Sequence, residues 1–299
     1  MAAARHLHLI MHAKAASHPE LRAAVTRARS LGHRITPRVT WEPGDAAIYA
    51  AEAHERGVDG IVAAGGDGTL HEIVNSLARV QLPTPVPLGV IPMGTANDFA
   101  VGLELPVGDP WDALRICLVD PVQEIDLGRL NDQYFVNMAS GGVGPQITRD
   151  TPEGIKWWFG GMAYFISSLA ALPVLEPTLC KVRVPGWQWE GPVFVLAVGN
   201  GRLAGGGVPV CARAAVNDGL LDLLVISDLE DNDVITLVTN LMRLHQPPSN
   251  AQTIYRQVPW VEVEARHPMT LTLDGEPLSG DRFRWDVLPR QLRMFLPPI

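Results

Sequence analysis

The sequence has few cysteines and no surplus of positive charge. Cys117, Cys180 and Cys211 are widely spaced and form no CxxC pair, so they provide no disulfide framework and fit a reducing cytosol. The formal net charge is −8, whereas a chain that binds nucleic acid through its phosphates is normally basic. The composition therefore predicts an ordinary globular protein for which nucleic acid is not a partner.

The N-terminus also lacks the apolar core of a signal peptide. His6, His8 and His12 alternate with apolar residues in "HLHLIMH", which predicts a first strand. The three histidines share one face of that strand. No cysteine or carboxylate accompanies them, so the pattern does not favour a metal site.

Charge is absent from residues 157–175, "WWFGGMAYFISSLAALPVL", and this stretch is long enough to span a bilayer. Thr151 and Pro152 in front of it are typical of a helix start, while the glycines and the proline inside it weaken a membrane span. We expect a buried helix near 152–171, or one that lines an apolar cleft, and no transmembrane helix.

Two different patterns divide the rest of the chain. Strand and helix signals alternate over residues 1–125, which predicts an α/β domain with a parallel sheet and helices on both faces. From residue 126 to residue 289 short strands follow one another through tight turns such as Asn131-Asp132, which predicts a mostly antiparallel β-sandwich. The expected strands include "PVFVLAVGN", "WVEVEA" and "MTLTLDG". We expect residues 290–299 to return to the first domain.

An unusually glycine-rich loop, "GGDGT" at Gly65–Thr69, joins an apolar strand to a segment with helical spacing from Leu70 to Leu77. Glycine allows a close approach to the main chain, and a helix N-terminus attracts anions. An ordinary tight turn is the alternative, but it needs one glycine rather than three. The loop therefore predicts a phosphate site. Thr40, Gly94 and Thr95 also follow strands and are expected at the same edge of the sheet.

Two familiar nucleotide motifs are missing. No GxxxxGK[ST] sequence occurs, and the glycine loop contains no lysine, so it is not a P-loop. Residues 198–207, "VGNGRLAGGG", lack the GxGxxG spacing and precede a strand rather than a helix, so they are not a dinucleotide fingerprint.

Four motifs occur in the order "GGDGTLHEIVN", "PMGTANDFA", "NDGLLDL" and "LDGEPLSG". In this order they resemble the diacylglycerol-kinase-type lipid kinases, and they are most similar to the bacterial YegS-like lipid kinases. The likeness covers essentially the whole chain, including "RVTWEPGDAA" and "GNGRLAGGG". It implies an α/β nucleotide domain and a β-sandwich, with the active site in the cleft between them.

The resemblance also implies a nucleotide site with a metal ion. Asp67 would lie beside the phosphates of ATP and help to hold the Mg²⁺ that bridges them, because carboxylate oxygens are preferred ligands of this ion. The residues expected to contact ATP are Thr40, Gly66, Asp67, Gly68, Thr69, Leu70, His71, Glu72 and Thr95.

Two further sites are implied in the second half of the chain. Glu276 would be the general base that takes the proton from a lipid hydroxyl group, although "DGEP" at 274–277 is also a plain hairpin sequence. A second cation, Mg²⁺ or Ca²⁺, would bind Asp218 and the backbone carbonyls of Ala215 and Leu220, although Asn-Asp-Gly is also a good turn sequence. For Asn97, Asp98 and Asp126, which match motif positions as well, a binding role and a structural role both stay open.

The activity implied is transfer of the γ-phosphate of ATP to a hydroxyl of a glycerolipid such as diacylglycerol or phosphatidylglycerol, in phospholipid metabolism. The protein would be cytoplasmic and would meet its lipid at the inner membrane surface. The alternatives are a kinase of a soluble acceptor such as NAD, and an inactive regulator that binds nucleotide or lipid. "PMGTANDFA" favours a lipid kinase, and the presence of Asp67, Asp218 and Glu276 together favours an active enzyme.

Overall fold

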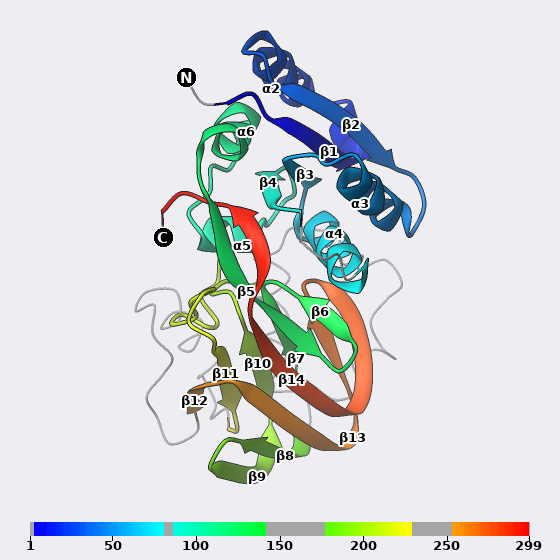
Figure 1. Cartoon of the computed structure of the whole chain (residues 1–299). Helices are drawn as coiled ribbons and strands as arrows, with labels where there is room; N and C mark the ends of the chain where they lie inside the picture. Colours follow the sequence, from blue (N-terminus) through cyan, green and yellow to red (C-terminus); the bar gives the residue numbers. More distant parts are fainter. Residues whose placement is uncertain (1–2, 81–85, 142–176, 229–252, 299) are drawn as a thin grey trace. The chain divides into compact units, whose positions relative to one another are not determined.

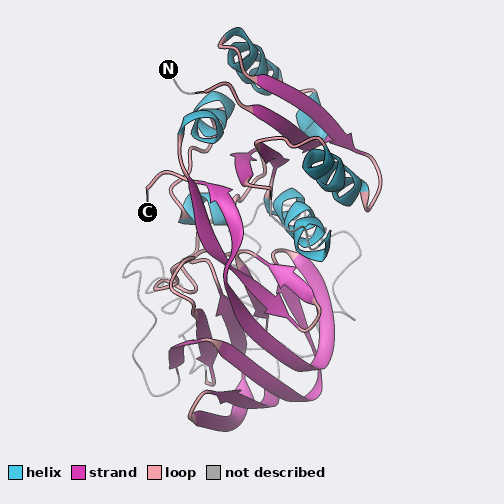
Figure 2. Ribbon diagram, viewed as in Figure 1, coloured by secondary structure: helices cyan, strands magenta, loops and turns pink. Residues whose placement is uncertain are grey.

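The structure is a computed structural model that describes residues 3–80, 86–141, 177–228 and 253–298 (Figure 1). The chain divides into two compact units. Unit 1 comprises Met1–Ile125 together with Arg290–Ile299, and unit 2 comprises Asp126–Pro289. Helices belong to unit 1, whereas the described part of unit 2 consists of strands and loops (Figure 2).

Unit 1 contains a parallel sheet in the order β4-β3-β1-β2. The C-terminal end of β14 adds to its edge, where Met294 pairs in parallel with Leu88. Leu7, Leu9 and Ile61 are among its fully buried residues, as expected for a sheet covered on both faces. The strands are β1 (His6–His12), β2 (Arg34–Thr40), β3 (Gly60–Gly65) and β4 (Leu88–Pro92).

Several helices of unit 1 begin at residues that favour a helix start. Pro19 opens α2, and the Asp109 carboxylate accepts hydrogen bonds from the N–H groups of Trp111 and Asp112 at the start of α6. Gly44, with a φ of 100°, precedes α3. The helices are α1 (Ala13–Ala16), α2 (Pro19–Ser30), α3 (Asp45–Glu55), α4 (Asp67–Val80), α5 (Asp98–Gly102) and α6 (Pro110–Val119).

The strand order of unit 1 reverses direction next to β1. The chain goes from β1 to β2 on one side and then returns across β1 to β3 and β4 on the other. Because crossover connections are right-handed, α2 covers one face of the sheet, and α3 and α4 cover the other. Ligands in such sheets bind outside the carboxyl ends of the strands, at the place where the order reverses. In unit 1 that place lies between β1 and β3.

Unit 2 is an antiparallel sheet assembly in the order β12-β11-β10-β7-β13-β14. The hairpin β8–β9 pairs with β13, and the hairpin β5–β6 pairs with β14. The strands are β5 (Val122–Leu130), β6 (Gln133–Phe135), β7 (Met138–Gly141), β8 (Thr178–Val184), β9 (Trp187–Val193), β10 (Val195–Gly199), β11 (Leu221–Ile226), β12 (Thr253–Val258), β13 (Trp260–Leu273) and β14 (Glu276–Phe295).

Alternate residues of these strands form the core of unit 2. Phe283, Trp285 and Val287 of β14 are buried and pack with buried residues of β8, β10 and β11. The residues between them in the sequence are more exposed, so the strand has one apolar and one polar face. The predicted fold class, an α/β domain with a parallel sheet and an antiparallel β-sandwich, is confirmed.

Two details of the strand prediction were wrong. The segment "PVFVLAVGN", expected as one strand, changes its pairing partner at Phe194, because β9 pairs with β8 while β10 pairs with β7 and β11. The segments "WVEVEA" and "MTLTLDG", expected as two strands, form the single strand β13, whose register shifts between Glu264 and Met269. Pro268 lies in that interval and has no N–H to donate.

The helix expected near 152–171 and the apolar stretch 157–175 lie outside the described residues. Within the described ranges, no helix combines the length and the apolar character needed to cross a bilayer.

Candidate active site

The glycine loop connects β3 to α4 through a tight packing contact. β3 ends at Gly65, and the N–H of Leu70 donates to the carbonyl of Gly66 at 3.1 Å, which starts the helix. A Cβ on Gly65 would lie 2.3 Å from Oγ1 of Thr69, so only glycine leaves room for the threonine against the main chain. Gly65 is therefore needed for the packing of Thr69 at the start of α4, where the sequence predicts a phosphate site.

A second loop, residues 94–97 of the "PMGTANDFA" motif, lies directly against the first. A Cβ on Gly94 would come within 2.5 Å of the Cα of Gly66, so the two main chains touch. Asn97, at a φ of 53°, accepts from the N–H of Gly94 at 2.8 Å and donates to its carbonyl at 2.8 Å. The N–H of Met93 donates to the carbonyl of Gly65 at 2.9 Å. The two motifs form one interlocked structure.

Asp67 joins this structure through its side chain. Its carboxylate accepts hydrogen bonds from the N–H groups of Asp98 at 3.2 Å and Phe99 at 3.4 Å, at the start of α5. Asp98 itself is buried. Asp67 and Asn97 thus hold backbone in place, which explains why a polar residue is needed at each position whether or not it also meets a ligand.

The strands β1, β2 and β3 end in register with one another, next to these loops. Thr40 pairs with His12, and Met11 pairs with Ala64, so Thr40, His12 and Gly65 lie side by side across three strands. Thr40 is buried. The residues that sequence reasoning placed at one sheet edge are therefore found there.

Glu72 links α4 to the loop that follows β2. Its carboxylate accepts a hydrogen bond from the backbone of Gly44. Burial raises the pKa of Glu72, and this hydrogen bond partly offsets the effect.

The expected ATP-contact residues differ in what they can offer to a ligand. Leu70 is buried, so only its backbone could face a nucleotide, and the ring of His71 lies beside the amide of Asn75. Gly68 and Thr95 are exposed.

Glu276 follows a two-residue hairpin turn in unit 2. Asp274 and Gly275 have φ values of 48° and 95°, which is the type I′ turn typical of Asp-Gly. The buried Asp274 carboxylate accepts from the N–H groups of Val136, Asn137 and Met138, at 2.8, 3.0 and 2.9 Å. Glu276 is exposed at the start of β14. It directly follows the turn that the hydrogen bonds of Asp274 hold in place.

Asp218 lies in the turn before β11, where it has a second carboxylate as a neighbour. Its Oδ1 accepts from the N–H of Leu220 at 2.9 Å, and the Asp126 carboxylate accepts from the N–H of Gly219 at 2.6 Å. Partial desolvation and the negative charge of Asp126 raise the pKa of Asp218. These carboxylates and the carbonyls of Ala215 and Leu220 are oxygen donors, which suits Mg²⁺ or Ca²⁺. Among the described residues no three His, Cys, Asp or Glu side chains gather as a metal cluster.

Sequence reasoning missed three residues that hold the backbone of unit 2. Asp274 is one, and the other two are the buried amides Asn137 and Asn200. The Nδ2 of Asn200 donates to the carbonyls of Asp126 and Val136, and the Nδ2 of Asn137 donates to that of Leu203. The segment "GNGRLAGGG" is therefore tied to the β6–β7 connection. Its glycines and asparagine were visible in the sequence, but their partners were not.

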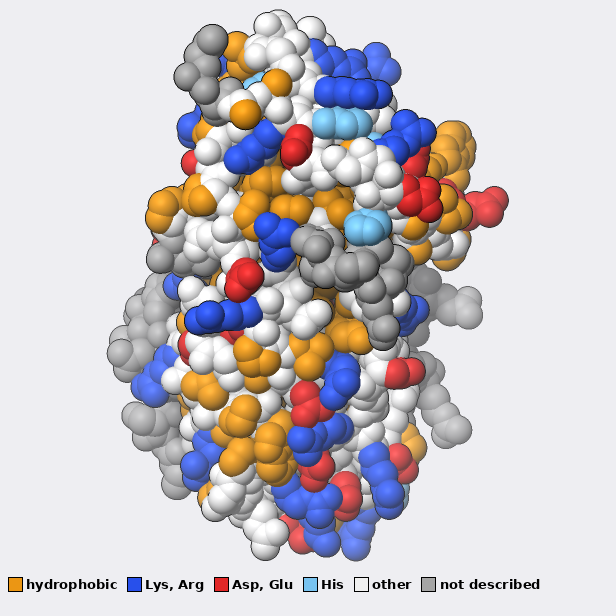
Figure 3. Space-filling model, in the orientation of Figure 1, with side chains coloured by type: hydrophobic (Ala, Val, Ile, Leu, Met, Phe, Trp, Pro, Cys, Tyr) orange, Lys and Arg blue, Asp and Glu red, His pale blue; other side chains and the backbone are white. Residues whose placement is uncertain are grey.

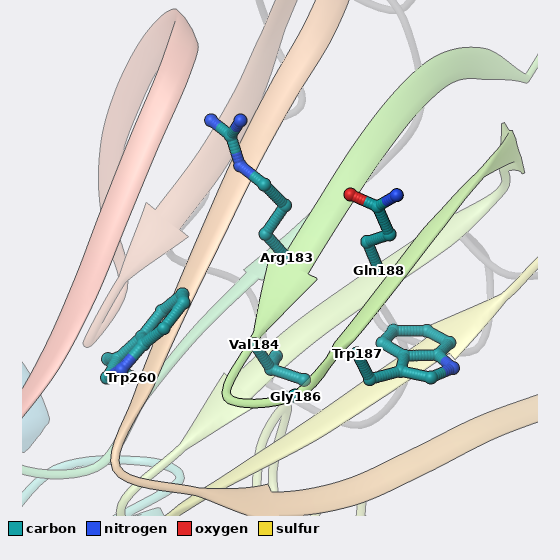
Figure 4. A pocket seen from close by; sticks show the side chains of 6 residues that line it. All are labelled: Arg183, Val184, Gly186, Trp187, Gln188 and Trp260. Atoms are coloured by element: carbon teal, nitrogen blue, oxygen red, sulfur yellow. The ribbon is translucent and has the colours of Figure 1, made fainter.

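An open surface depression of about 350 Å³ lies elsewhere in unit 2, at the turn between β8 and β9 (Figure 4). Basic and acidic side chains mix closely over this end of unit 2 (Figure 3). Arg183 in its wall already pairs with Glu262 and Glu264 at 3.1 and 3.0 Å. None of the predicted site residues contributes to it. The lining residues are Arg183, Val184, Gly186, Trp187, Gln188 and Trp260.

Comparison with known proteins gives a family match for each half of the chain. The diacylglycerol kinase catalytic domain matches residues 6–130, and the YegS C-terminal NAD kinase beta sandwich-like domain matches residues 137–296. A Serratia proteamaculans (strain 568) protein named probable lipid kinase YegS-like is 42% identical over 291 residues, which cover 97% of this chain and 93% of the relative. The chain belongs to the YegS-like lipid kinase family.

Other members and a solved structure agree with this assignment. A YegS-like relative from Klebsiella pneumoniae (strain 342) is 42% identical over 292 residues, covering 97% of this chain and 95% of the relative. The structure of a candidate diacylglycerol kinase from Bacillus anthracis (strain Sterne) superposes with a TM-score of 0.82 at 25% identity, over 98% of each chain. The YegS-like fold thus extends over both units.

Proposed function

We propose that this protein is a lipid kinase that transfers the γ-phosphate of ATP to a hydroxyl group of a glycerolipid. The observation that carries the proposal is the contact between Gly66 and Gly94, where two family motifs meet main chain to main chain at the start of α4. Such a surface offers backbone N–H groups at a helix N-terminus, and phosphoryl transfer depends mainly on positioning and on charge neutralisation of the phosphates.

The glycine loop would receive the phosphates of ATP. Gly68 and Thr69 lie in the first turn of α4, whose N–H groups have no partner within the helix. The Asp67 carboxylate lies at the start of the same helix, where it accepts hydrogen bonds from the N–H groups of Asp98 and Phe99. We expect its oxygens also to help hold a Mg²⁺ ion, which would neutralise charge on the phosphates.

Glu276 would act as the general base. It is exposed and ionisable, and the hydrogen bonds of Asp274 hold its turn. A carboxylate in hydrogen-bond reach of the acceptor hydroxyl takes its proton while the new O–P bond forms. The oxygen then attacks the γ-phosphorus, and ADP leaves with the electron pair of the broken bond.

The turn that carries Asp218 would hold a second cation, Mg²⁺ or Ca²⁺. The site would consist of Asp218 and the carbonyls of Ala215 and Leu220. Desolvation and, to a lesser extent, the negative charge of Asp126 raise the pKa of Asp218, and a cation there would favour the ionised carboxylate. Its effect would be to brace the turn between residue 215 and β11.

We place the acceptor in a membrane rather than in solution. The "PMGTANDFA" motif and the family favour a lipid over NAD, and the alternative of an inactive regulator gives no chemical need for Asp67, Asp218 and Glu276 together. The protein would work from the cytoplasm at the inner membrane surface, in phospholipid metabolism.

The test is the transfer of labelled γ-phosphate from ATP, with Mg²⁺, into mixed lipid vesicles that contain diacylglycerol and phosphatidylglycerol. The proposal expects label in a lipid product. Label in NAD or another soluble alcohol, with none in lipid, would replace the lipid by a soluble acceptor. Binding of ATP without transfer to any acceptor would favour the alternative of an inactive regulator.

A further inference from the structure

Trp41, in the motif "RVTWEPGDAA", is a large apolar side chain with almost no protein contact. Its exposed fraction is 82%, the largest among the exposed hydrophobic residues in the described part of the chain. An indole ring can bury a large apolar area. An exposed Trp41 therefore gives the fold little of the hydrophobic free energy that a buried tryptophan contributes. The remainder of the motif explains the loop but not the need for an aromatic ring.

The backbone that carries Trp41 is fixed. The Asp45 carboxylate accepts from the N–H of Trp41 at 2.7 Å and from that of Glu42 at 3.1 Å, and these hydrogen bonds lower the pKa of Asp45. Gly44 then starts α3 and is bound to Glu72 of α4. The loop after β2 is thereby tied to the helix that begins at the glycine loop, and Trp41 has a defined position relative to both.

Strand register gives that position. Thr40, His12 and Gly65 form one row across β2, β1 and β3, so Trp41 and Gly66 are the next residues on the two outer strands of the row. Neighbouring strands are about 4.8 Å apart, which separates β2 from β3 by roughly 10 Å. This is the span of a ribose and its first phosphates. A nucleotide with its terminal phosphates at the glycine loop therefore reaches Trp41 with its base.

Charge favours a base over a lipid surface at this position. Glu42 and Asp45 are the charged neighbours of Trp41 in the loop, and carboxylates repel the anionic surface of a membrane. An uncharged aromatic base is not repelled. Resting on the ATP-dependent function proposed above, we infer that Trp41 provides the stacking surface for the base of the nucleoside triphosphate.

Stacking on an aromatic side chain is tolerant of base identity, because every base has a π-face. The inference therefore predicts that Trp41 contributes to affinity for ATP and GTP alike, and that it contributes nothing to the binding of a ligand with phosphates but no base. Inorganic tripolyphosphate is such a ligand.

The experiment compares dissociation constants for Mg²⁺-ATP and Mg²⁺-tripolyphosphate by calorimetry, for the wild type, Trp41→Ala and Trp41→Phe. Since base stacking contributes appreciably to affinity, Trp41→Ala should weaken ATP binding about fivefold to a hundredfold and tripolyphosphate binding less than twofold. Trp41→Phe should keep most of the ATP affinity. Leu31→Ala, at an exposed apolar residue at the end of α2, is the matched control and should change neither ligand.

Four results would overturn the inference. If the wild type binds ATP and Trp41→Ala binds it equally well, Trp41 is not the stacking surface for the base, and the proposed kinase function stands. Equal losses for ATP and tripolyphosphate would show a distorted loop instead of a lost stack. Unchanged ATP affinity with weaker binding to phosphatidylcholine–phosphatidylglycerol vesicles would assign Trp41 to the membrane. A wild type that binds neither ATP nor tripolyphosphate would reject the proposed function itself, and the inference with it.

Discussion

The two units use the same device, an aspartate that binds backbone N–H groups, at two motif positions. In unit 1 Asp67 binds the N–H groups of Asp98 and Phe99, about thirty residues on in the chain. In unit 2 Asp274 binds three N–H groups, those of residues 136–138. Asp274 is buried and Asp67 is partly exposed. Both cases show that a motif aspartate can be required to hold the backbone of its loop, whatever part it also takes in the chemistry.

One buried ionisable group in each unit, a histidine in unit 1 and an aspartate in unit 2, gives a second comparison. Unit 1 buries His8, whose two ring nitrogens have no hydrogen-bond partner, beneath α3. Unit 2 buries Asp222, which accepts hydrogen bonds from the hydroxyl of Tyr255 and from Gln257. Burial favours the neutral form of each group, which is the deprotonated histidine and the protonated aspartate. The contributions of these two groups to stability should therefore change with acid in opposite directions.

The largest expected effect is that of Asp274→Ala. The substitution leaves three buried N–H groups without their charged acceptor, and we expect a loss of about 3–5 kcal/mol of unfolding free energy. Urea denaturation followed by circular dichroism measures it. Asp67→Ala, which removes two longer hydrogen bonds at a less buried residue, should cost clearly less. Equal losses of unfolding free energy in the two variants would contradict the expected difference between Asp274 and Asp67.

The next effect is the pH dependence contributed by Asp222. Burial raises its pKa to about 6 from 3.8. Its contribution to stability is fully present below pH 3.8 and is lost as the pH rises through 6, at a cost of about 3 kcal/mol for a shift of about two units. Asp222→Asn should therefore flatten the stability profile between pH 4 and 7 relative to the wild type. Parallel profiles of the two proteins would contradict the assignment.

A smaller effect is expected for Gly94→Ala. The added Cβ would meet the Cα of Gly66 at 2.5 Å and Oδ1 of Asn97 at 2.9 Å, so one main chain must shift, at about 1–3 kcal/mol. ATP affinity should fall as well, because the shift opens the glycine loop. Gly108→Ala, with a φ of 92° and no atom within 4 Å, is the control: it should lower stability somewhat and leave ATP affinity unchanged. Normal ATP binding by Gly94→Ala would disprove the interlock of the two loops.

The smallest effect is that of His8 in unit 1. Burial lowers its pKa below 6.5, and so do the positive charges of Arg38, His6 and Arg56, whereas Glu52 acts in the opposite direction. The stability that His8 contributes is present above pH 6.5 and declines as the pH falls below that value. The reason is that the histidine binds a proton in the unfolded chain at a higher pH than in the folded chain. His8→Leu should remove this decline in urea denaturation at pH 7.5 and 5.5. An unchanged decline would place its origin elsewhere.

The sequence was informative where a pattern is local. The alternation of strands and helices predicted the parallel sheet, and Asn131-Asp132 and Asp274-Gly275 marked turns, because these signals depend on a few adjacent residues. The break at Phe194 and the continuous β13 were not predictable, since they depend on which distant strand is the partner. The same holds for Asp274, whose acceptor role depends on N–H groups of residues 136–138. The catalytic role of Glu276 and the nucleotide contacts stay predictions.

The central claim is that Glu276 carries out the chemistry of a lipid kinase. The most direct measurement is the rate of γ-phosphate transfer from ATP into diacylglycerol- and phosphatidylglycerol-containing vesicles, by the wild type and by Glu276→Gln. The account predicts labelled lipid with the wild type and a fall in kcat of about a hundredfold to ten-thousandfold in the variant, with ATP affinity and stability unchanged. A variant that transfers phosphate to lipid at the wild-type rate would contradict it.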